Sequence, residues 1–287
     1  MTKVFRCLTV LTISVAFATA SIALAQAYTT IDFPGAIATT LDGGPNPEGT
    51  NIGSYTDTSG VTHGFVLKDG EFTTIDPPGS TSTTPNWISP QGAIVGGFND
   101  SSGVSHGFIL EGGEYTTVDF PGAPGTTLTG LSPSGEIVGF YCRTSSCTTD
   151  HSFMDSKQGV FTTFDPPDAI SSTASTVNPS GVIVGAYTDS GGVGHGYLYN
   201  GTFTTIDFPG ATFTFAGANN PAGDIVGEYN DTSGVGHSFL LSKGVFTSFD
   251  PPGTVGFSDA AGINPSGIIV GIYFDSAVVE HGYIRTK

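Results

Sequence analysis

The feature that most constrains the fold is a repeat that runs through the chain. The segment GVTHGFVLKDGEFTTIDPPG at residues 60–79 returns as GVSHGFILEGGEYTTVDFPG at residues 103–122. Two motifs recur six times each, with copies 42 to 46 residues apart. One is [FY]T[TS] followed by an apolar residue and Asp, and the other is [NS]P-x-G-x-x-[VI]-G-x-[YF]. All six histidines belong to the repeat. The fold must therefore be built from copies of one supersecondary unit.

Each copy has the pattern of four short strands joined by turns. In the fourth copy, Asn178–Gly181 places Pro and Gly where a type I turn takes them, and the β-branched VIVGAY follows. A loop then leads to HGYLY, Asn200-Gly201 marks a hairpin, and FTTID ends before a proline. We name the strands a (rich in Thr and Ala), b (IVG), c (beginning at the histidine) and d (FTTID). No helical periodicity follows residue 27.

Four meandering strands per unit of about 43 residues are typical of a β-propeller blade. After residue 27 the chain starts on a d strand, at Tyr28–Asp32, and it finishes on a c strand that has no d strand after it. The sequence therefore predicts an all-β, six-bladed β-propeller of four-stranded blades, closed by the N-terminal strand, which completes the last blade. A β-solenoid or an open array of sheets is the alternative.

The N-terminal segment resembles a secretory signal peptide. Lys3 and Arg6 precede an apolar stretch, and Ala25-Gln26-Ala27 and Ala23-Leu24-Ala25 are candidate cleavage signals. A membrane anchor is the alternative interpretation, which we disfavour because the first repeat begins immediately afterwards. We expect a signal peptide at residues 1–27, a single six-repeat domain at residues 28–287, and a secreted protein, extracellular or periplasmic.

Charge and cysteine content narrow the set of partners. Residues 1–27 hold two of the eight basic and none of the 25 acidic residues, so their removal shifts the formal net charge from −17 to −19. Such a charge repels phosphate backbones, so we expect no nucleic-acid partner, and no later segment is apolar enough to span a membrane. We expect a monomer. Cys142 and Cys147 are predicted to form a disulfide in an oxidising compartment, since their spacing matches no common zinc motif.

Each histidine begins a c strand, and an aspartate ends the d strand that follows. Counting across the hairpin places the two side chains opposite each other, where a carboxylate can orient the imidazole. A catalytic or metal-binding ring is the alternative, but a feature copied into every unit favours a structural role. The predicted pairs are His63–Asp76, His106–Asp119, His151–Asp165, His195–Asp207, His237–Asp250 and, between the chain ends, His281–Asp32.

The stretches NPSGVIVG and NPSGIIVG, each followed by a histidine-containing strand, resemble the probable extracellular repeat family named for its His-Ala-Phe motif. The resemblance covers nearly all of residues 28–287. The motif here is His-Gly-Phe, His-Gly-Tyr or His-Ser-Phe, so the chain is a variant. The resemblance implies a bacterial, secreted protein. It implies no known reaction and transfers no catalytic residue.

Function is expected where one copy departs from the others. Five b–c loops carry an aspartate, and the third, which holds both cysteines, carries Arg143 instead. Arg143 is a candidate for binding a carboxylate or sulfate, and an ion pair with Asp150 is the simpler interpretation. We interpret the aspartates as turn caps, although they are weak calcium candidates; we otherwise expect no cofactor. They are Asp57, Asp100, Asp189, Asp231 and Asp275.

Trp87, the single tryptophan, is the second candidate for ligand binding. It lies two residues before an Asn/Ser-Pro turn, where the other copies have Gly44, Gly130, Thr176, Ala218 and Gly262. A ring at this position either stacks on a sugar or plugs the channel, and we favour the plug because buried aromatic rings usually serve packing.

The leading hypothesis is a non-enzymatic binding or scaffold protein for carbohydrate or cell-surface ligands. One alternative is a propeller-type polysaccharide hydrolase or lyase. That chemistry needs a unique pair of carboxylates, and none is apparent outside the repeated positions. The other alternative is a purely structural surface or adhesion component. The sequence identifies no catalytic residue.

Overall fold

The computed structural model describes residues 26–156 and 159–286. The expected signal peptide lies outside the described residues, apart from Gln26 and Ala27. Within the described ranges the chain forms twenty-four β-strands and no helix, and so none that could cross a membrane. The all-β prediction is confirmed, and the repeat explains it, because each copy consists of short β-branched runs separated by Gly- and Pro-rich turns.

Within the described residues the strands form five sheets, and four of these have four strands each. In three of the four, consecutive strands pair antiparallel in a meander. In the remaining one, the first strand of the chain pairs antiparallel with the last. The four sheets comprise β2 (Ala38–Thr39), β3 (Asn51–Thr56), β4 (Thr62–Lys68) and β5 (Glu71–Ile75); β6 (Ser82–Ile88), β7 (Ile94–Asn99), β8 (Ser105–Glu111) and β9 (Glu114–Val118); β10 (Gly125–Leu131), β11 (Ile137–Cys142), β12 (Asp150–Ser156) and β13 (Val160–Thr163); and β22 (Ser258–Ile263), β23 (Ile269–Phe274), β24 (Glu280–Thr286) and β1 (Ala27–Ile31).

The remaining eight strands form one sheet made of two meanders. A single parallel bridge between Gly194 and Phe213 joins the two meanders, and every other pairing within them is antiparallel. The first meander is β14 (Ala169–Val177), β15 (Ile183–Asp189), β16 (Gly194–Tyr199) and β17 (Phe203–Ile206); the second is β18 (Phe213–Asn219), β19 (Ile225–Asn230), β20 (Gly236–Ser242) and β21 (Val245–Phe249).

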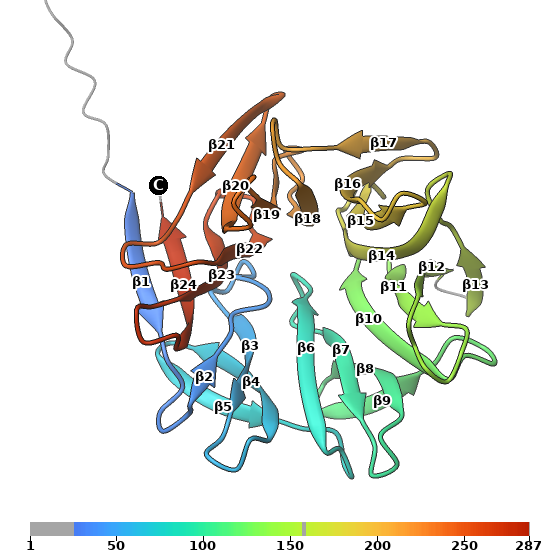
Figure 1. The fold of residues 1–287 in the computed structure, drawn as a ribbon. Helices are drawn as coiled ribbons and strands as arrows, with labels where there is room; N and C mark the ends of the chain where they lie inside the picture. The colour runs from blue at the N-terminus through green and yellow to red at the C-terminus, as the bar shows by residue number, and fades with distance from the viewer. Residues whose placement is uncertain (1–25, 157–158, 287) are drawn as a thin grey trace, which may run out of the picture.

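The sheets surround a common centre in a propeller-like arrangement (Figure 1). The a strands, such as β6, β10 and β18, lie toward the middle, and the d strands, such as β5, β9 and β21, lie toward the outside. At the chain ends, β1 pairs antiparallel with β24, so the first strand is the outer strand of the last sheet.

The core lies between the faces of neighbouring sheets. One cluster packs Ile52 and Ile75 from the first sheet against Ile88, Ile94 and Phe108 from the second. Ile52 and Phe108 are fully buried. Packing of this kind between neighbouring sheets holds the a strands in fixed positions around the centre of the propeller-like arrangement.

The glycine of the IVG motif is required by close approach of strand a. A Cβ atom at Gly185 would collide with the backbone carbonyl oxygen of Thr173 and with the ring of the fully buried Tyr197. The corresponding strand-a carbonyl lies as close at the other five positions, which are Gly53, Gly96, Gly139, Gly227 and Gly271. The invariant glycine thus seats strand a against strand b, where strand a carries a bulge.

Gly185→Ala is therefore expected to lower the free energy of unfolding by about 3 kcal/mol, because backbone must move to admit the methyl group. Urea-induced unfolding of the parent and the variant measures the difference. Gly191→Ala, in an exposed loop where the new Cβ meets only the Asp189 carboxylate, is the matched control and should change stability little. Equal effects of the two substitutions would contradict the close-approach explanation.

Candidate functional site

Each histidine is bonded to the aspartate that the hairpin register predicts. Nδ1 of the imidazole lies 2.6 to 3.0 Å from a carboxylate oxygen in all six pairs, including the pair between His281 and Asp32 at opposite ends of the sequence. Hydrogen bonds to Asp32 and Asp275 outweigh the effect of burial and raise the pKa of His281 above its ordinary value.

In five repeats the imidazole also faces a second carboxylate. Nε2 lies 3.5 to 3.7 Å from the aspartate of the b–c loop. That aspartate caps its own turn, as predicted. The Asp57 carboxylate, for example, accepts hydrogen bonds from the backbone N–H groups of Ser59 and Val61 at 2.8 and 2.9 Å. The bonds lower the pKa of Asp57, and at Asp231 a further bond from the Ser233 hydroxyl lowers the pKa to about 2.

The described residues contain no group of three or more His, Cys, Asp or Glu side chains placed to hold a metal ion. The repeated histidines and aspartates instead make the same local contacts in nearly every copy. A site that acts once must therefore be sought where the copies differ.

A cavity of about 520 Å³ lies among the a strands, at the centre of the propeller-like arrangement. Its wall includes Thr84, Thr127 and Thr173, hydroxyl-bearing residues that occupy one shared position on neighbouring a strands. The rings of Phe98 and Phe140, from b strands, also line it. The cavity thus combines hydroxyl groups with aromatic faces.

The threonine position is replaced in the last two repeats. Strand register places Phe215 on β18 and Asp259 on β22 at the position held by Thr173, and Phe215 lies opposite Glu228 on β19. Asp42 lines the same cavity from the turn after β2. Three carboxyl groups at positions the repeat does not share thus come from the first, fifth and sixth repeats.

These carboxyl groups lie in a desolvated environment. Burial raises the pKa of Asp42 to about 7, even though the hydroxyl groups of Thr40 and Ser54 hydrogen bond to it. Burial, and then mutual repulsion with Asp259, also raises the pKa of Glu228, and burial raises that of Asp259. Within the described residues, Asp259 Oδ1 and Glu228 Oε2 have no hydrogen-bond partner. A carboxyl group held partly protonated at neutral pH can donate a hydrogen bond as well as accept one.

Sequence reasoning missed Glu228 and Asp259, two buried carboxyl groups outside the repeated positions that interact with each other. Each could have been found by aligning the copies: Glu228 follows the IVG glycine, where the other repeats have Ser, Gly, Phe, Ala and Ile. Asp259 replaces a threonine on strand a, where a bulge between strands a and b makes alignment from sequence difficult.

Trp87 lies in a narrow cavity of about 70 Å³ at the Asn/Ser-Pro turns, lined by prolines from all six repeats. Its ring packs against the buried clusters that include Ala218 and Leu128. In the first repeat, Gly43 rather than Gly44 occupies the equivalent position, since Gly43 bridges to Ile52 as Trp87 pairs with Val95. The large cavity and Trp87 are thus separate features.

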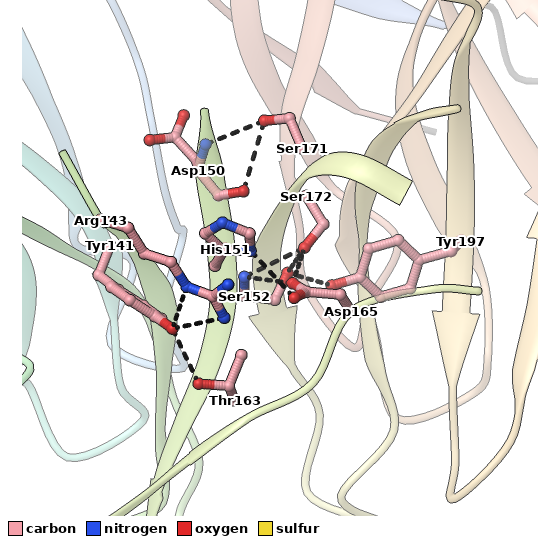
Figure 2. A network of polar contacts seen from close by, with 10 residues as sticks. All are labelled: Tyr141, Arg143, Asp150, His151, Ser152, Thr163, Asp165, Ser171, Ser172 and Tyr197. Carbon is pink, nitrogen blue, oxygen red and sulfur yellow. Dashed lines mark hydrogen bonds and ion pairs between the residues drawn. The ribbon is translucent and has the colours of Figure 1, made fainter. Parts of the chain in front are cut away.

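The third repeat differs at its b–c loop. The predicted disulfide between Cys142 and Cys147 is confirmed, with the Cα atoms 5.0 Å apart. The expected ion pair between Arg143 and Asp150 is not among the contacts of the described residues. The Arg143 guanidinium donates instead to the Tyr141 hydroxyl, from Nε and Nη2 at 3.3 Å each (Figure 2). The ion pair was the wrong expectation because the phenol oxygen on the same strand offers a nearer acceptor.

No family model matches the chain, and no curated protein matches it. Solved structures show the fold. A catalytically inactive variant of virginiamycin B lyase from Staphylococcus aureus, with quinupristin, is 11% identical, with a TM-score of 0.54, over 91% of this chain and 100% of that one. A putative TolB from Agrobacterium tumefaciens is 15% identical, with a TM-score of 0.58, over 86% of this chain and 89% of that one.

A variant of the Aleuria aurantia lectin, in complex with α-methyl-L-fucoside, is 11% identical to this chain, with a TM-score of 0.53. The match covers 88% of this chain and 93% of the lectin. At such identities the likeness establishes a shared propeller fold and nothing about the ligand.

Proposed function

We propose that the protein is an exported, non-enzymatic binding protein whose central cavity takes a carbohydrate. The observation that carries the proposal is the composition of the cavity wall. Hydroxyl groups of Thr127 and Thr173 offer donors and acceptors, Phe140 and Phe215 offer flat apolar faces, and the Asp259 carboxyl adds a further polar group. Sugar rings present hydroxyl groups at their edges and C–H groups on their faces, so both kinds of surface have a partner.

We further propose a closed ring of six four-stranded blades. The two meanders of the eight-stranded sheet each have the strand order of a separate blade, and only one bridge joins them. The pairing of β1 with β24 gives the last sheet its fourth strand. We assign the chain to the extracellular repeats with the His-Ala-Phe motif, as a variant, and we expect a monomer.

Export is part of the proposal. The Cys142–Cys147 disulfide suits an oxidising compartment. Of the two candidate cleavage signals, the contacts favour cleavage after Ala25, since Ala27 pairs with Thr286 in β1 and the Gln26 side chain accepts a hydrogen bond from Arg285. Cleavage after Ala27 would remove both contacts.

A glycan array tests the carbohydrate proposal. The parent protein is expected to bind a defined set of glycans, and Phe140→Ala and Phe215→Ala are each expected to weaken that binding about tenfold, because a stacking face is lost. Ile37→Ala, an exposed position outside the cavity, is the matched control. Trp87→Ala probes the separate small cavity at the Asn/Ser-Pro turns, and it should leave binding unchanged if folding is kept. Absence of binding to any glycan would overturn the proposal and favour a purely structural role.

The unshared carboxyl groups favour hydrolase or lyase chemistry as the second candidate function. Glu228 and Asp259 have raised pKa values, as a general acid at neutral pH requires. Incubation with the glycans identified on the array, followed by analysis for shortened chains, tests it. Cleavage that is lost in Asp259→Asn and Glu228→Gln, with binding retained, would establish an enzyme.

A further inference from the structure

The third repeat lacks a carboxylate that the other five repeats share. In those five, the imidazole lies between two carboxylates, one bonded to Nδ1 and one, from the b–c loop, 3.5 to 3.7 Å from Nε2. His151 keeps the first contact, with Asp165 at 3.0 Å. Arg143 stands where the loop aspartate would be, and no carboxylate of the described residues lies within 4.0 Å of His151 Nε2.

Tyr141 anchors the arginine beside this histidine. Its hydroxyl group accepts from the Arg143 guanidinium and also bonds to the Thr163 hydroxyl at 3.0 Å. The Tyr141 ring stacks on Phe120, and its centroid lies 5.7 Å from that of His151. Figure 2 shows the arginine, tyrosine and histidine side chains in one group. The guanidinium has five N–H donors, of which two point at the phenol oxygen.

Asp150, the acidic residue expected to pair with the arginine, makes no ion pair with it among the described residues. The Asp150 carboxyl group is half-buried, and burial raises its pKa, with an opposing effect from His151. In Figure 2 the carboxyl group points away from the Arg143 guanidinium, while the Asp150 backbone N–H donates to the Ser171 hydroxyl at 3.0 Å. The exposed Arg143 side chain therefore lies near the partly buried His151, on a protein whose formal net charge is −17.

We propose that Arg143 and His151 bind the carboxylate of an acidic sugar, which takes the place that the loop aspartate occupies in the other five repeats. A guanidinium pairs with a carboxylate through two N–H donors. Because Nδ1–H of His151 donates to Asp165, Nε2 carries a hydrogen only in the imidazolium form, and in that form it adds a third donor. A carboxylate is favoured over other anions because a carboxylate fills this position in every other copy, and a single negative charge limits repulsion from the acidic surface.

The carboxylate site extends the proposed function. Binding of a carboxylate at this site is independent of that function, and only the statement that the carboxylate belongs to a sugar rests on it. Phe140, which lines the central cavity, lies on β11 three residues before Arg143. The carboxylate site and the cavity wall thus share one strand. An oligosaccharide with one uronate unit could place its charge at Arg143 and a neighbouring ring in the cavity.

Isothermal titration of the full mature chain with glucuronate, acetate and glucose tests the site. Glucuronate and acetate are expected to bind, and glucose, which lacks the carboxylate, is not expected to bind at this site. Arg143→Asp restores the residue of the other repeats, so folding should be kept, and it should weaken glucuronate binding about tenfold or more because a charge-assisted pair is lost. Asp189→Arg, which rebuilds the arrangement beside His195, should add a second site.

The outcomes separate the two proposals. Acetate binding that depends on Arg143, in a protein that binds no glycan, supports the carboxylate site while the carbohydrate function fails. Binding of uronate-containing glycans that is unaffected by Arg143→Asp supports the central cavity and overturns the carboxylate site. Glucuronate binding no tighter than glucose binding also overturns it. Circular dichroism and the melting temperature of each variant confirm that it has folded.

Discussion

Deletion of residues 28–34 is expected to destabilise the whole protein rather than fray one end. These residues connect the last sheet to the first. Thr30 bonds to the Tyr273 hydroxyl at 2.9 Å on one side, and the Phe33 ring stacks on Tyr55 at 3.6 Å on the other. Ile31 and Phe33 both pack against a cluster of buried residues from the first and last sheets. Their loss removes apolar burial and exposes the edge of β24.

We expect the deletion to lower the free energy of unfolding by about 5 kcal/mol or more, with one cooperative transition shifted to lower urea concentration. Circular dichroism and limited proteolysis measure this loss. A peptide of residues 26–36, added in excess, should restore part of the stability, because it can pair with β24 again. A truncated protein as stable as the parent would rule out closure by β1 and favour an open array.

Stability should pass through a maximum near pH 4 to 5 and fall as the pH rises. Asp42 has a pKa of about 7 in the folded protein, above the ordinary carboxyl value, and Glu228 and Asp259 shift in the same direction because of burial. A folded state that binds more protons than the unfolded state loses stability with rising pH over the interval between the two pKa values. His281, whose pKa is also raised, contributes in the same sense above its unfolded pKa.

The loop aspartates make stability increase with pH rather than decrease, and they do so at lower pH values. Backbone hydrogen bonds lower the pKa of Asp57 and its equivalents, so their contribution is present above about pH 4 and is lost as the pH falls through the lowered values. The loop aspartates lower stability in acid, and the buried carboxyl groups lower it toward neutral pH. Maximum stability is therefore expected between these two pH ranges.

Urea unfolding from pH 3 to pH 9 measures the profile, and we expect a loss of about 3 kcal/mol between pH 5 and pH 8. Asp259→Asn should flatten the alkaline limb and raise stability at pH 8. Asp57→Asn, the matched control at a capped turn, should leave that limb unchanged. A profile that rises from pH 5 to pH 8 in the parent would show that the cavity carboxyl groups ionise without cost.

The histidine–aspartate contacts could be predicted because a hairpin fixes the register on both sides of its turn. Once Asp69 and Gly70 are placed at the turn, counting outward brings His63 opposite Asp76, 13 residues later, and the same count holds in the second and fifth copies. The hairpin is one residue longer in the third copy and one residue shorter in the fourth, and the sixth pair joins the chain ends. The disulfide could be predicted because the two cysteines lie in one short loop. Local spacing determines both features.

Placing Asp42 and Asp259 in the cavity depends on an alignment that spacing does not provide. Counting back from the Asn-Pro turn places Gly44 beside Trp87, but strand pairing places Gly43 there, so the first repeat has one extra residue before the turn. This shift puts Asp42 level with Asn86. Burial, which raises the pKa values of these carboxyl groups, arises only where neighbouring sheets meet, and a single repeat contains no information about it.

The pairing of β1 with β24 also sets an order of events during biosynthesis. A ribosome or an export channel delivers the N-terminal strand first, and its partner, residues Glu280–Thr286, comes last. The earlier meanders hold their own four strands and can form as they emerge, since their contacts are local. The N-terminal strand must remain unpaired until residues Glu280–Thr286 have emerged. The last sheet therefore forms after the earlier meanders, and a chain truncated before Glu280 leaves the first strand without a partner.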